Sequence, residues 1–576
     1  TLNLIFVLKE EYMAGLTGGQ LTAEALIQQG VETIFTLSGG HITPIYQYLE
    51  HSPIKLFDTR HEQAAVFMAE AFGRMTGKPG TAMVTAGPGF TNALTAVANA
   101  RLANSPLVLI SGCVGIECIE KLDLQDMRQA PVIEPMVKKA LVCHKTERIP
   151  EFIDLAYRTA ISGRPGPVYL ELPVDVLNNQ VSPAAVKRTH TVIQSRPVDL
   201  NQGRRIIEML LQASRPIIIA GSGAWYSQAG KDLVSFVEKT GIPAFTSSLG
   251  RGTIPDNHPL CFESSLAIRP GAALFANMSA DLVLFLGARM SLFYIFGDLF
   301  NQEAKIIQAD IEAEEIGRNR SVDLPVVGDI QALLSVCNHL IDETNLALGF
   351  QKRFEDWIST LKKAEEDGKA AAKAQWESSN VPIHPMRLTA EINNFMDRED
   401  DIVVADGGDT QIWMGMTRTV QQSGHYLDSG LYGCLGVGLP YANAAKFLHP
   451  QKRVCLIIGD GSVGFNFMEF ETALRKNLPI VAVISNDLGW GMIRHSQEVK
   501  IGHAIQDGTY IGRVDYHKMV EALGGKGMLV EKPEDIRPAL EEAFDSGKVT
   551  CINVMTDPTT ISPGSVALAN LGAYKA

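Results

Sequence analysis

Cysteine is scarce in this sequence and is not spaced for metal or disulfide chemistry. The 576 residues include eight cysteines, without a C-x-x-C pair, and only Cys113 and Cys118 lie close together. This scatter argues against zinc ribbons and against a disulfide framework. We therefore expect a protein of a reduced, cytoplasmic environment.

Long hydrophobic runs and basic clusters are missing as well. The longest apolar stretches, such as 216–220 and 454–458, have the length of strands, whereas a membrane span needs about 20 residues. The 51 basic side chains are outnumbered by 64 acidic ones, which gives a net charge of −13. The sequence thus argues against nucleic-acid and membrane binding and favours chemistry on small molecules.

What the sequence does have is length and a regular alternation of elements. A chain of 576 residues with 46% apolar content should divide into three or four domains of roughly 150 residues. Amphipathic helical stretches alternate with short apolar strands, which predicts an α/β fold of three consecutive, doubly wound parallel-sheet domains. The expected divisions are an extension at 1–12 ahead of a natural start at Met13, a first domain at 13–180, a middle nucleotide-fold domain at 195–345, a helical connector at 346–380, a third domain at 381–560 and a tail at 561–576.

The most informative motif lies in the third domain. Strand 454–458 leads into Gly459-Asp460-Gly461, and strand 480–485 leads into Asn486-Asp487. Both turns should lie at the carboxyl edge of adjacent parallel strands, where open α/β sheets bind ligands. Mg²⁺ prefers oxygen ligands and usually bridges to phosphate, and the glycines would let a diphosphate approach the backbone. The alternative is a plain glycine turn without a metal.

These two segments, separated by 24 residues, resemble the fingerprint of thiamine diphosphate enzymes. The family usually has a second Asn where Asp487 stands, so this chain adds a carboxylate that should tighten Mg²⁺ but also adds charge near the diphosphate. The resemblance implies thiamine diphosphate and Mg²⁺ as cofactors, with Asp460, Asp487 and the main chain of Gly489 as metal ligands. The residues expected at the diphosphate are Gly459, Asp460, Gly461, Ser462, Asp487 and Gly489.

Thiamine chemistry also needs a carboxyl group against the aminopyrimidine ring, and Glu62 fits that role. It stands where a helix with an apolar face begins, and a Glu in an apolar pocket suits proton exchange. The resemblance implies that Glu62 serves a cofactor held by the third domain of another subunit. An obligate homodimer, assembled into a homotetramer, is therefore expected. A surface Glu at a helix N-terminus is the alternative.

The resemblance extends over nearly the whole chain and is closest to benzaldehyde lyase and the acetolactate synthase-like 2-hydroxyacyl-CoA lyases. It implies that His41 projects at the substrate as a proton shuttle and that Gln125 hydrogen-bonds the reacting intermediate. It also implies that Gly433 offers its carbonyl to the pyrimidine amine and that Leu435 wedges between the cofactor rings. A loop histidine, a surface amide and a glycine-rich helix start are the structural alternatives.

Three further residues are expected to line the substrate cleft: Gln411, Ser429 and Trp490. Benzaldehyde lyase has a Tyr and a His where Gln411 and Ser429 stand, so aromatic specificity does not follow. Core packing is the alternative for Trp490.

The middle domain has nucleotide-fold features, with Gly221-Ser222-Gly223, Arg289 and Asp310-Ile311-Glu312 at strand ends. Relatives hold ADP, FAD or no nucleotide at this place. A G-x-G alone is a weak signal, so an empty, structural middle domain is favoured over one that binds ADP or FAD.

The sequence thus predicts a thiamine diphosphate-dependent lyase and carboligase. Glu62 would activate the cofactor, while His41 and Gln125 would handle protons and the alkoxide of small carbonyl substrates, namely 2-hydroxy ketones or 2-hydroxyacyl compounds and aldehydes. Acetolactate synthase and 2-hydroxyacyl-CoA lyase are the enzymatic alternatives. Biosynthetic acetolactate synthases have no His at the position of His41. A non-catalytic thiamine-fold regulatory subunit is disfavoured because the motifs are intact.

Overall fold

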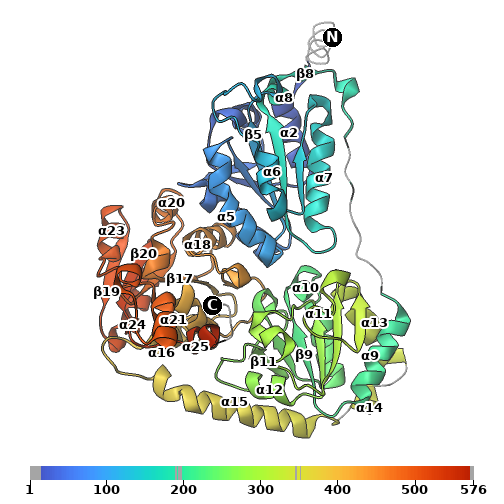
Figure 1. Cartoon of the computed structure of the whole chain (residues 1–576), viewed down its shortest axis with the longest axis vertical. Helices are drawn as coiled ribbons and strands as arrows, with labels where there is room; N and C mark the ends of the chain where they lie inside the picture. Colours follow the sequence, from blue (N-terminus) through green and yellow to red (C-terminus); the bar gives the residue numbers. More distant parts are fainter. Residues whose placement is uncertain (1–14, 189–190, 192–197, 344–346, 351, 571–576) are drawn as a thin grey trace. The chain divides into compact units, whose positions relative to one another are not determined.

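A computed structural model describes residues 15–188, 191, 198–343, 347–350 and 352–570 (Figure 1). The predicted extension at 1–12 lies outside the described residues, as does the end of the predicted tail from 571 onward. The chain divides into two compact units. The first contains the residues up to 194 together with 430–434, and the second contains 195–429 and the residues from 435 onward.

The first unit is built on a six-stranded sheet in which every pairing is parallel. In sheet order its strands are β3 (Lys55–Asp58), β2 (Thr33–Thr36), β4 (Gly80–Val84), β5 (Leu107–Cys113), β7 (Pro167–Pro173) and β6 (Lys139–Val142). Its helices are α2 (Gly18–Gln28), α3 (Thr43–Leu49), α4 (Glu62–Thr76), α5 (Pro88–Ala103), α6 (Gln129–Ile133), α7 (Ile149–Ile161) and α8 (Val174–Asn178). Helices α2, α3 and α7 share one core with alternate strand residues, while α4 and α5 pack against each other.

A short antiparallel ladder closes the first unit. Strand β1 (Leu16–Thr17) pairs with β8 (Gln180–Val181). This pairing includes Gln180 and Val181, at the predicted end of the first domain.

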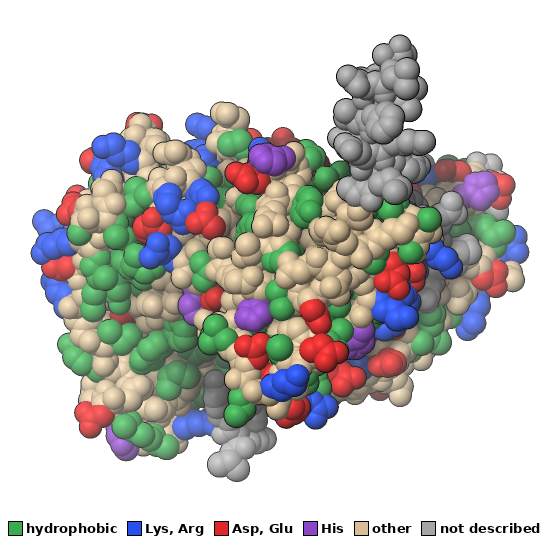
Figure 2. Space-filling view, turned by 90° about the horizontal axis from the view of Figure 1, so that it is seen from above, with side chains coloured by type: hydrophobic (Ala, Val, Ile, Leu, Met, Phe, Trp, Pro, Cys, Tyr) green, Lys and Arg blue, Asp and Glu red, His purple; other side chains and the backbone are tan. Residues whose placement is uncertain are grey.

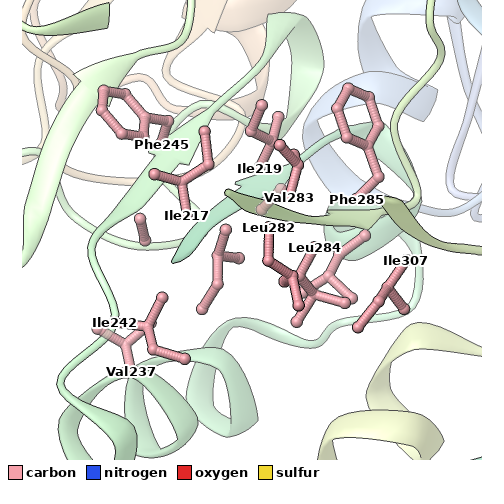
Figure 3. Close-up of a cluster of buried hydrophobic side chains, with 14 of the residues drawn as sticks. Ile217, Ile219, Val237, Ile242, Phe245, Leu282, Val283, Leu284, Phe285 and Ile307 are labelled. Carbon is pink, nitrogen blue, oxygen red and sulfur yellow. The ribbon is translucent and has the colours of Figure 1, made fainter. Parts of the chain in front are cut away.

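The second unit contains two further parallel six-stranded sheets. The sheet of the middle domain has the order β11 (Cys261–Ser264), β10 (Ala244–Thr246), β9 (Pro216–Ala220), β12 (Leu282–Leu286), β13 (Lys305–Asp310) and β14 (Leu324–Val327). Its helices are α9 (Leu200–Gln212), α10 (Ser222–Tyr226), α11 (Gly230–Thr240), α12 (Ala273–Ser279), α13 (Ile330–Glu343) and α14 (Ala347–Phe350). Figure 3 shows Val283 and Phe285 on the same side of this sheet as Ile219, with Leu282 and Leu284 on the other, as the two-residue period of a strand requires.

The third sheet has the order β16 (Tyr426–Leu427), β15 (Ile402–Asp406), β17 (Val454–Gly459), β18 (Val481–Asn486), β20 (Thr550–Met555) and β19 (Lys526–Val530). Its helices are α16 (Pro385–Phe395), α17 (Gly408–Thr417), α18 (Gly438–Leu448), α19 (Asp460–Val463), α20 (Glu469–Arg475), α21 (Gly491–Ile501), α22 (Gln506–Thr509), α23 (Tyr516–Ala522), α24 (Ile536–Asp545) and α25 (Pro563–Asn570). Helix α25 lies in the predicted tail.

A long helix, α15 (Glu355–Trp376), runs within the predicted connector. It is not exposed along its whole length, because Trp357 and Leu361 are buried in the core of the middle domain. Glu365 also forms an ion pair with Arg269 of that domain. These contacts attach the connector firmly to the middle sheet.

The three parallel-sheet α/β domains confirm the predicted fold class. Within the described ranges, no helix is long and apolar enough to span a bilayer. On the face drawn in Figure 2, Lys and Arg side chains are interspersed with Asp and Glu.

Candidate functional site

In the first unit, three predicted site residues gather around one turn, residues 85–89, between β4 and α5. His41 lies in a short 3-10 turn (Gly40–Ile42), and its Nδ1 is 3.3 Å from Thr85 Oγ1. Glu62 begins α4, and its Oε1 would lie 3.5 Å from a Cβ added to Gly89. The side chain of Gln125 packs against Gly87, where an added Cβ would meet it at 2.8 Å.

Glu62 is buried, as the predicted role requires, with 8% of its surface exposed. The helix starts at this residue because the preceding His61 caps it, with its ring nitrogen accepting from the backbone N–H of Gln63. Asn92 of α5 donates a hydrogen bond to Glu62 Oε2 over 2.9 Å. The prediction from sequence missed Asn92, although it follows strand β4 in the segment Gly87-Pro88-Gly89-Phe90-Thr91-Asn92.

His41 is placed to remain uncharged near neutral pH. Burial lowers its pKa below the ordinary value of 6.5, and the negative charge of Asp123 opposes this only in part. A neutral imidazole can accept a proton on one ring nitrogen while the other bonds Thr85.

In the second unit, the residues predicted as metal ligands lie together. Strands β17 and β18 are neighbours with Gly459 opposite Ser485, so the segments that follow them start side by side. Burial raises the pKa of Asp460, and repulsion from Asp487 raises it further. Hydrogen bonds from the N–H groups of Gly461 and Gly489 act in the opposite direction. Burial also raises the pKa of Asp487, although the charge of Arg494 opposes this.

These residues fit a divalent cation beside a diphosphate. Asp460 Oδ2 is buried without a hydrogen-bond partner, and a carboxylate oxygen in that state is satisfied by a metal ion. Among the described residues, no group of three or more His, Cys, Asp and Glu side chains is arranged to hold a metal. Two carboxylates, a main-chain carbonyl and phosphate oxygens would still suit Mg²⁺, which seldom uses an all-protein cage.

Asp406 ties the loops of this site together, and the prediction from sequence missed it. Its carboxylate accepts from Ser462 Oγ at 2.6 Å and from the N–H groups of Gly407 and Gly438 at 2.6 and 2.7 Å. Burial raises the pKa of Asp406 to about 6, and these donors limit the rise. The signal in the sequence was an Asp directly after a strand and before Gly407-Gly408, at the same sheet edge as Asp460.

The predicted substrate-lining residues are arranged as follows. Ser429 Oγ donates to Gln411 Oε1 over 2.8 Å, so these two residues form a polar pair. The ring of Trp490 covers Gly461, where an added Cβ would stand 2.7 Å from Trp490 Cε3. It also contacts Phe465, with the ring centroids 6.2 Å apart.

The two residues predicted to shape the cofactor lie in one segment of the chain. Gly433 is exposed with a φ of +67°, and it groups with the first unit. Leu435 is half-buried and belongs to the second. Their roles at the cofactor stay predictions.

The glycines of the middle domain have a purely local explanation. An added Cβ at Gly221 would lie 2.5 Å from Gly287 O, and one at Gly223 would lie 2.7 Å from Gly287 Cα. The N–H of Gly223 donates to Gly287 O over 2.9 Å. This close approach of the turns after β9 and β12 requires small residues by itself, so the G-x-G is no argument for a nucleotide.

Comparison with known proteins agrees with this arrangement. Residues 16–132, 204–336 and 406–554 match the N-terminal TPP binding, central and C-terminal TPP binding domains of thiamine pyrophosphate enzymes. A probable acetolactate synthase of Mycobacterium bovis is 35% identical over 552 residues, which is 96% of this chain and 98% of that protein. A 2-hydroxyacyl-CoA lyase of Arabidopsis thaliana is 31% identical over 561 residues, 94% of this chain and 96% of the relative. A 2-hydroxyacyl-CoA lyase 2 of Danio rerio is 30% identical over 617 residues, covering 98% and 96%.

The sheet edge with its Gly-Asp-Gly turn, the buried glutamate and the match of all three domains lead to one conclusion: this chain belongs to the family of thiamine pyrophosphate enzymes.

Proposed function

We propose that this protein is a cytoplasmic, thiamine diphosphate- and Mg²⁺-dependent lyase and carboligase that breaks or forms the C–C bond beside a carbonyl. Its donors are 2-hydroxy ketones or 2-hydroxyacyl compounds, and its acceptors are aldehydes. The observation that carries this proposal is His41, a half-buried imidazole with a lowered pKa that contacts the same turn, residues 85–89, as buried Glu62 does. A base at that place suits removal of the proton from a substrate hydroxyl, which is the step that releases an aldehyde or ketone.

Each residue of the first unit has one task in this proposal. When bound, the cofactor supplies a nucleophilic carbon that adds to the substrate carbonyl. Glu62 exchanges a proton with the aminopyrimidine ring, and Asn92 fixes one of its carboxylate oxygens. His41 bonds Thr85 through Nδ1, which assigns Nε2 to the substrate hydroxyl. The amide of Gln125 donates to the developing alkoxide.

The residues of the second unit hold the diphosphate end. Mg²⁺ would be held by Asp460, Asp487 and the carbonyl of Gly489. The diphosphate would lie against the Gly459-Asp460-Gly461 turn that follows β17. Trp490, Gln411 and Ser429 line the substrate cleft, and the polar Gln411–Ser429 pair favours a polar or aliphatic acceptor over an aromatic one. In the assembled homodimer or homotetramer, Glu62 serves the cofactor held by a second copy.

Acetolactate synthase is the second candidate, since the relative from Mycobacterium bovis carries that name at 35% identity. That enzyme would release CO₂ and make acetolactate from pyruvate alone. A 2-hydroxyacyl-CoA lyase, named among the relatives at 31%, would be a special case of the lyase proposed here, with a thioester as donor.

A product screen tests the proposal. The holoenzyme is offered pyruvate, benzaldehyde, formaldehyde and a 2-hydroxyacyl-CoA separately, and the products are identified by mass spectrometry. Cleavage of the 2-hydroxyacyl donor or ligation of aldehydes, strongly reduced in His41→Ala, is expected. Acetolactate and CO₂ from pyruvate as the sole products, with His41→Ala fully active, would establish the second candidate instead.

Glu62→Gln gives an independent check of the cofactor assignment. Near-complete loss of turnover is expected, with thiamine diphosphate and Mg²⁺ still bound in calorimetry. Unchanged turnover would refute the role given to Glu62.

A further inference from the structure

The metal turn of this chain carries one more negative charge than the fingerprint it resembles. Asp487 stands where an Asn is usual, and its carboxyl group lies against that of Asp460. A diphosphate brought to the same turn adds further negative charge. Without compensation, the additional carboxylate would repel the group that the site has to bind, because like charges close together at a buried site repel strongly.

The guanidinium of Arg494 supplies that compensation. Its Nη2 lies 2.8 Å from Asp487 Oδ2, and its Nη1 donates to the main-chain carbonyl of Asp487 over 3.2 Å. Both side chains are largely buried, with 9% of Arg494 and 17% of Asp487 exposed. The guanidinium therefore forms two hydrogen bonds with Asp487. Solvent and salt screen a partly buried ion pair of this kind much less than they screen a pair on the surface.

The local sequence makes room for this contact. A Cβ added to Gly491 would stand 2.2 Å from Asp487 Oδ2, whereas one added to Gly489 would first meet the main-chain oxygen of Thr509 at 2.3 Å. Arg494 also lies in the first turn of α21 (Gly491–Ile501), where the helix dipole disfavours a cation. The negative charge of Asp487 offsets that disadvantage. Gly491 and an otherwise unfavourable cation thus both lie against the Asp487 carboxylate.

We propose that Arg494 is a positioning residue that offsets the additional charge of Asp487, so that the turn accepts a divalent ion and a diphosphate together. The inference rests on the proposed function, since it takes the Asp460–Asp487 turn as the site of the cation. It deepens that proposal by assigning a task to a residue outside the fingerprint. Asp487 and Arg494 then form a pair whose members have to be exchanged together.

The test is a double-mutant cycle with Arg494→Gln, Asp487→Asn and the combined variant. Thiamine diphosphate binding is measured by calorimetry at saturating Mg²⁺, and Mn²⁺ binding without the cofactor is measured by electron paramagnetic resonance. Arg494→Gln is expected to weaken thiamine diphosphate binding by about tenfold or more, yet to tighten Mn²⁺, because two carboxylates are left uncompensated. The combined variant is expected to regain thiamine diphosphate affinity to within about threefold of the wild type.

Two further variants separate charge from folding. Arg494→Lys keeps the positive charge and is expected to bind thiamine diphosphate more tightly than Arg494→Gln. Arg513→Gln, which removes a half-exposed arginine of the same domain, is expected to bind both probes as the wild type does.

Equal weakening in Arg494→Gln and the combined variant, or none in either, would overturn the inference while leaving the proposed function intact. A wild type that takes up no thiamine diphosphate would overturn both.

Discussion

Asn92 Nδ2 donates to Glu62 Oε2 over 2.9 Å, and this bond joins α5 to the first residue of α4. The same two helices carry a second pair of this type, in which Asn99 Nδ2 donates to both carboxylate oxygens of Glu70 at 3.0 and 2.9 Å. Glu70 is fully buried, whereas Glu62 retains 8% exposure. The two pairs share their chemistry, but only the first lies beside the turn 85–89 that His41 contacts.

Asn92→Ala is therefore expected to lower turnover by about tenfold or more, since a hydrogen bond to a charged group is worth roughly 1.5–3 kcal/mol. The carboxylate of Glu62 would lose the contact that orients it, while thiamine diphosphate affinity should stay within a few-fold. The measurement is the exchange rate of the cofactor C2 proton with deuterium, followed by quenched-flow NMR beside turnover. In Asn99→Ala we expect a lower melting temperature and a normal exchange rate. Equal exchange rates in Asn92→Ala and the wild type would remove Asn92 from the proton pathway.

The fold and the meeting of two carboxylates at one sheet edge could be predicted because they follow from backbone patterns. Apolar runs such as β9 (Pro216–Ala220) coincide with the predicted strands, and a parallel strand places the residue after it at the ligand-binding edge. This brought Asp460 and Asp487 together in the prediction. Asp406 stands at the same edge and could have been found by the same rule. Asn92 could not, because its hydrogen bond to Glu62 joins two different helices, and Arg494 could not, because only its side-chain geometry identifies Asp487 as its partner.

Asp406→Asn is expected to reduce the free energy of unfolding by about 1–3 kcal/mol. The carboxylate accepts from Ser462 Oγ and from two backbone N–H groups. In Asn, one of the two oxygens is replaced by an NH₂ group, which cannot accept these hydrogen bonds. Denaturant unfolding measures the effect. Ser462→Ala removes only one of the donors, so its loss should be smaller. If Ser462→Ala lowers the free energy of unfolding as much as Asp406→Asn does, or more, then Asp406 does not hold these loops together through all three hydrogen bonds.

Gly461→Ala tests the contact between the metal turn and Trp490. The new Cβ would stand 2.7 Å from the indole ring, and overpacking of this kind costs about 1–3 kcal/mol. We expect altered tryptophan fluorescence and thiamine diphosphate affinity weakened by about tenfold. Gly464 is the matched control, because its added Cβ would meet only Gly461 O, at 3.6 Å. If Gly464→Ala disturbs binding as much as Gly461→Ala does, the contact with Trp490 is not the reason.

His495 forms hydrogen bonds that connect helix α21 with the segment that leads into α25, the last described helix. Its Nδ1 lies 2.6 Å from Asp409 Oδ2 and its Nε2 lies 3.0 Å from the carbonyl of Pro558. Asp409 Oδ1 in turn accepts from Ser562 and Ser565, each over 2.5 Å. Because both ring nitrogens face acceptors, this arrangement suits the protonated imidazole. Burial alone would lower the pKa of His495, but its hydrogen bonds to Asp409 and Pro558 outweigh burial and raise it above 6.5.

A raised folded-state pKa means that the contact stabilises the fold fully below about pH 6.5, the unfolded-state value. That contribution is lost as the pH rises through the higher folded-state pKa. After correction for intrinsic exchange, hydrogen–deuterium protection of residues 558–570, measured from pH 6 to pH 9, should therefore fall as the pH rises above about 6.5 in the wild type. In His495→Gln the protection should be about tenfold lower than in the wild type at low pH, and it should be nearly independent of pH. His339→Gln, at an exposed histidine, should behave as the wild type does. Constant protection of the wild type across this range would show that the charge on His495 does not hold the segment in place.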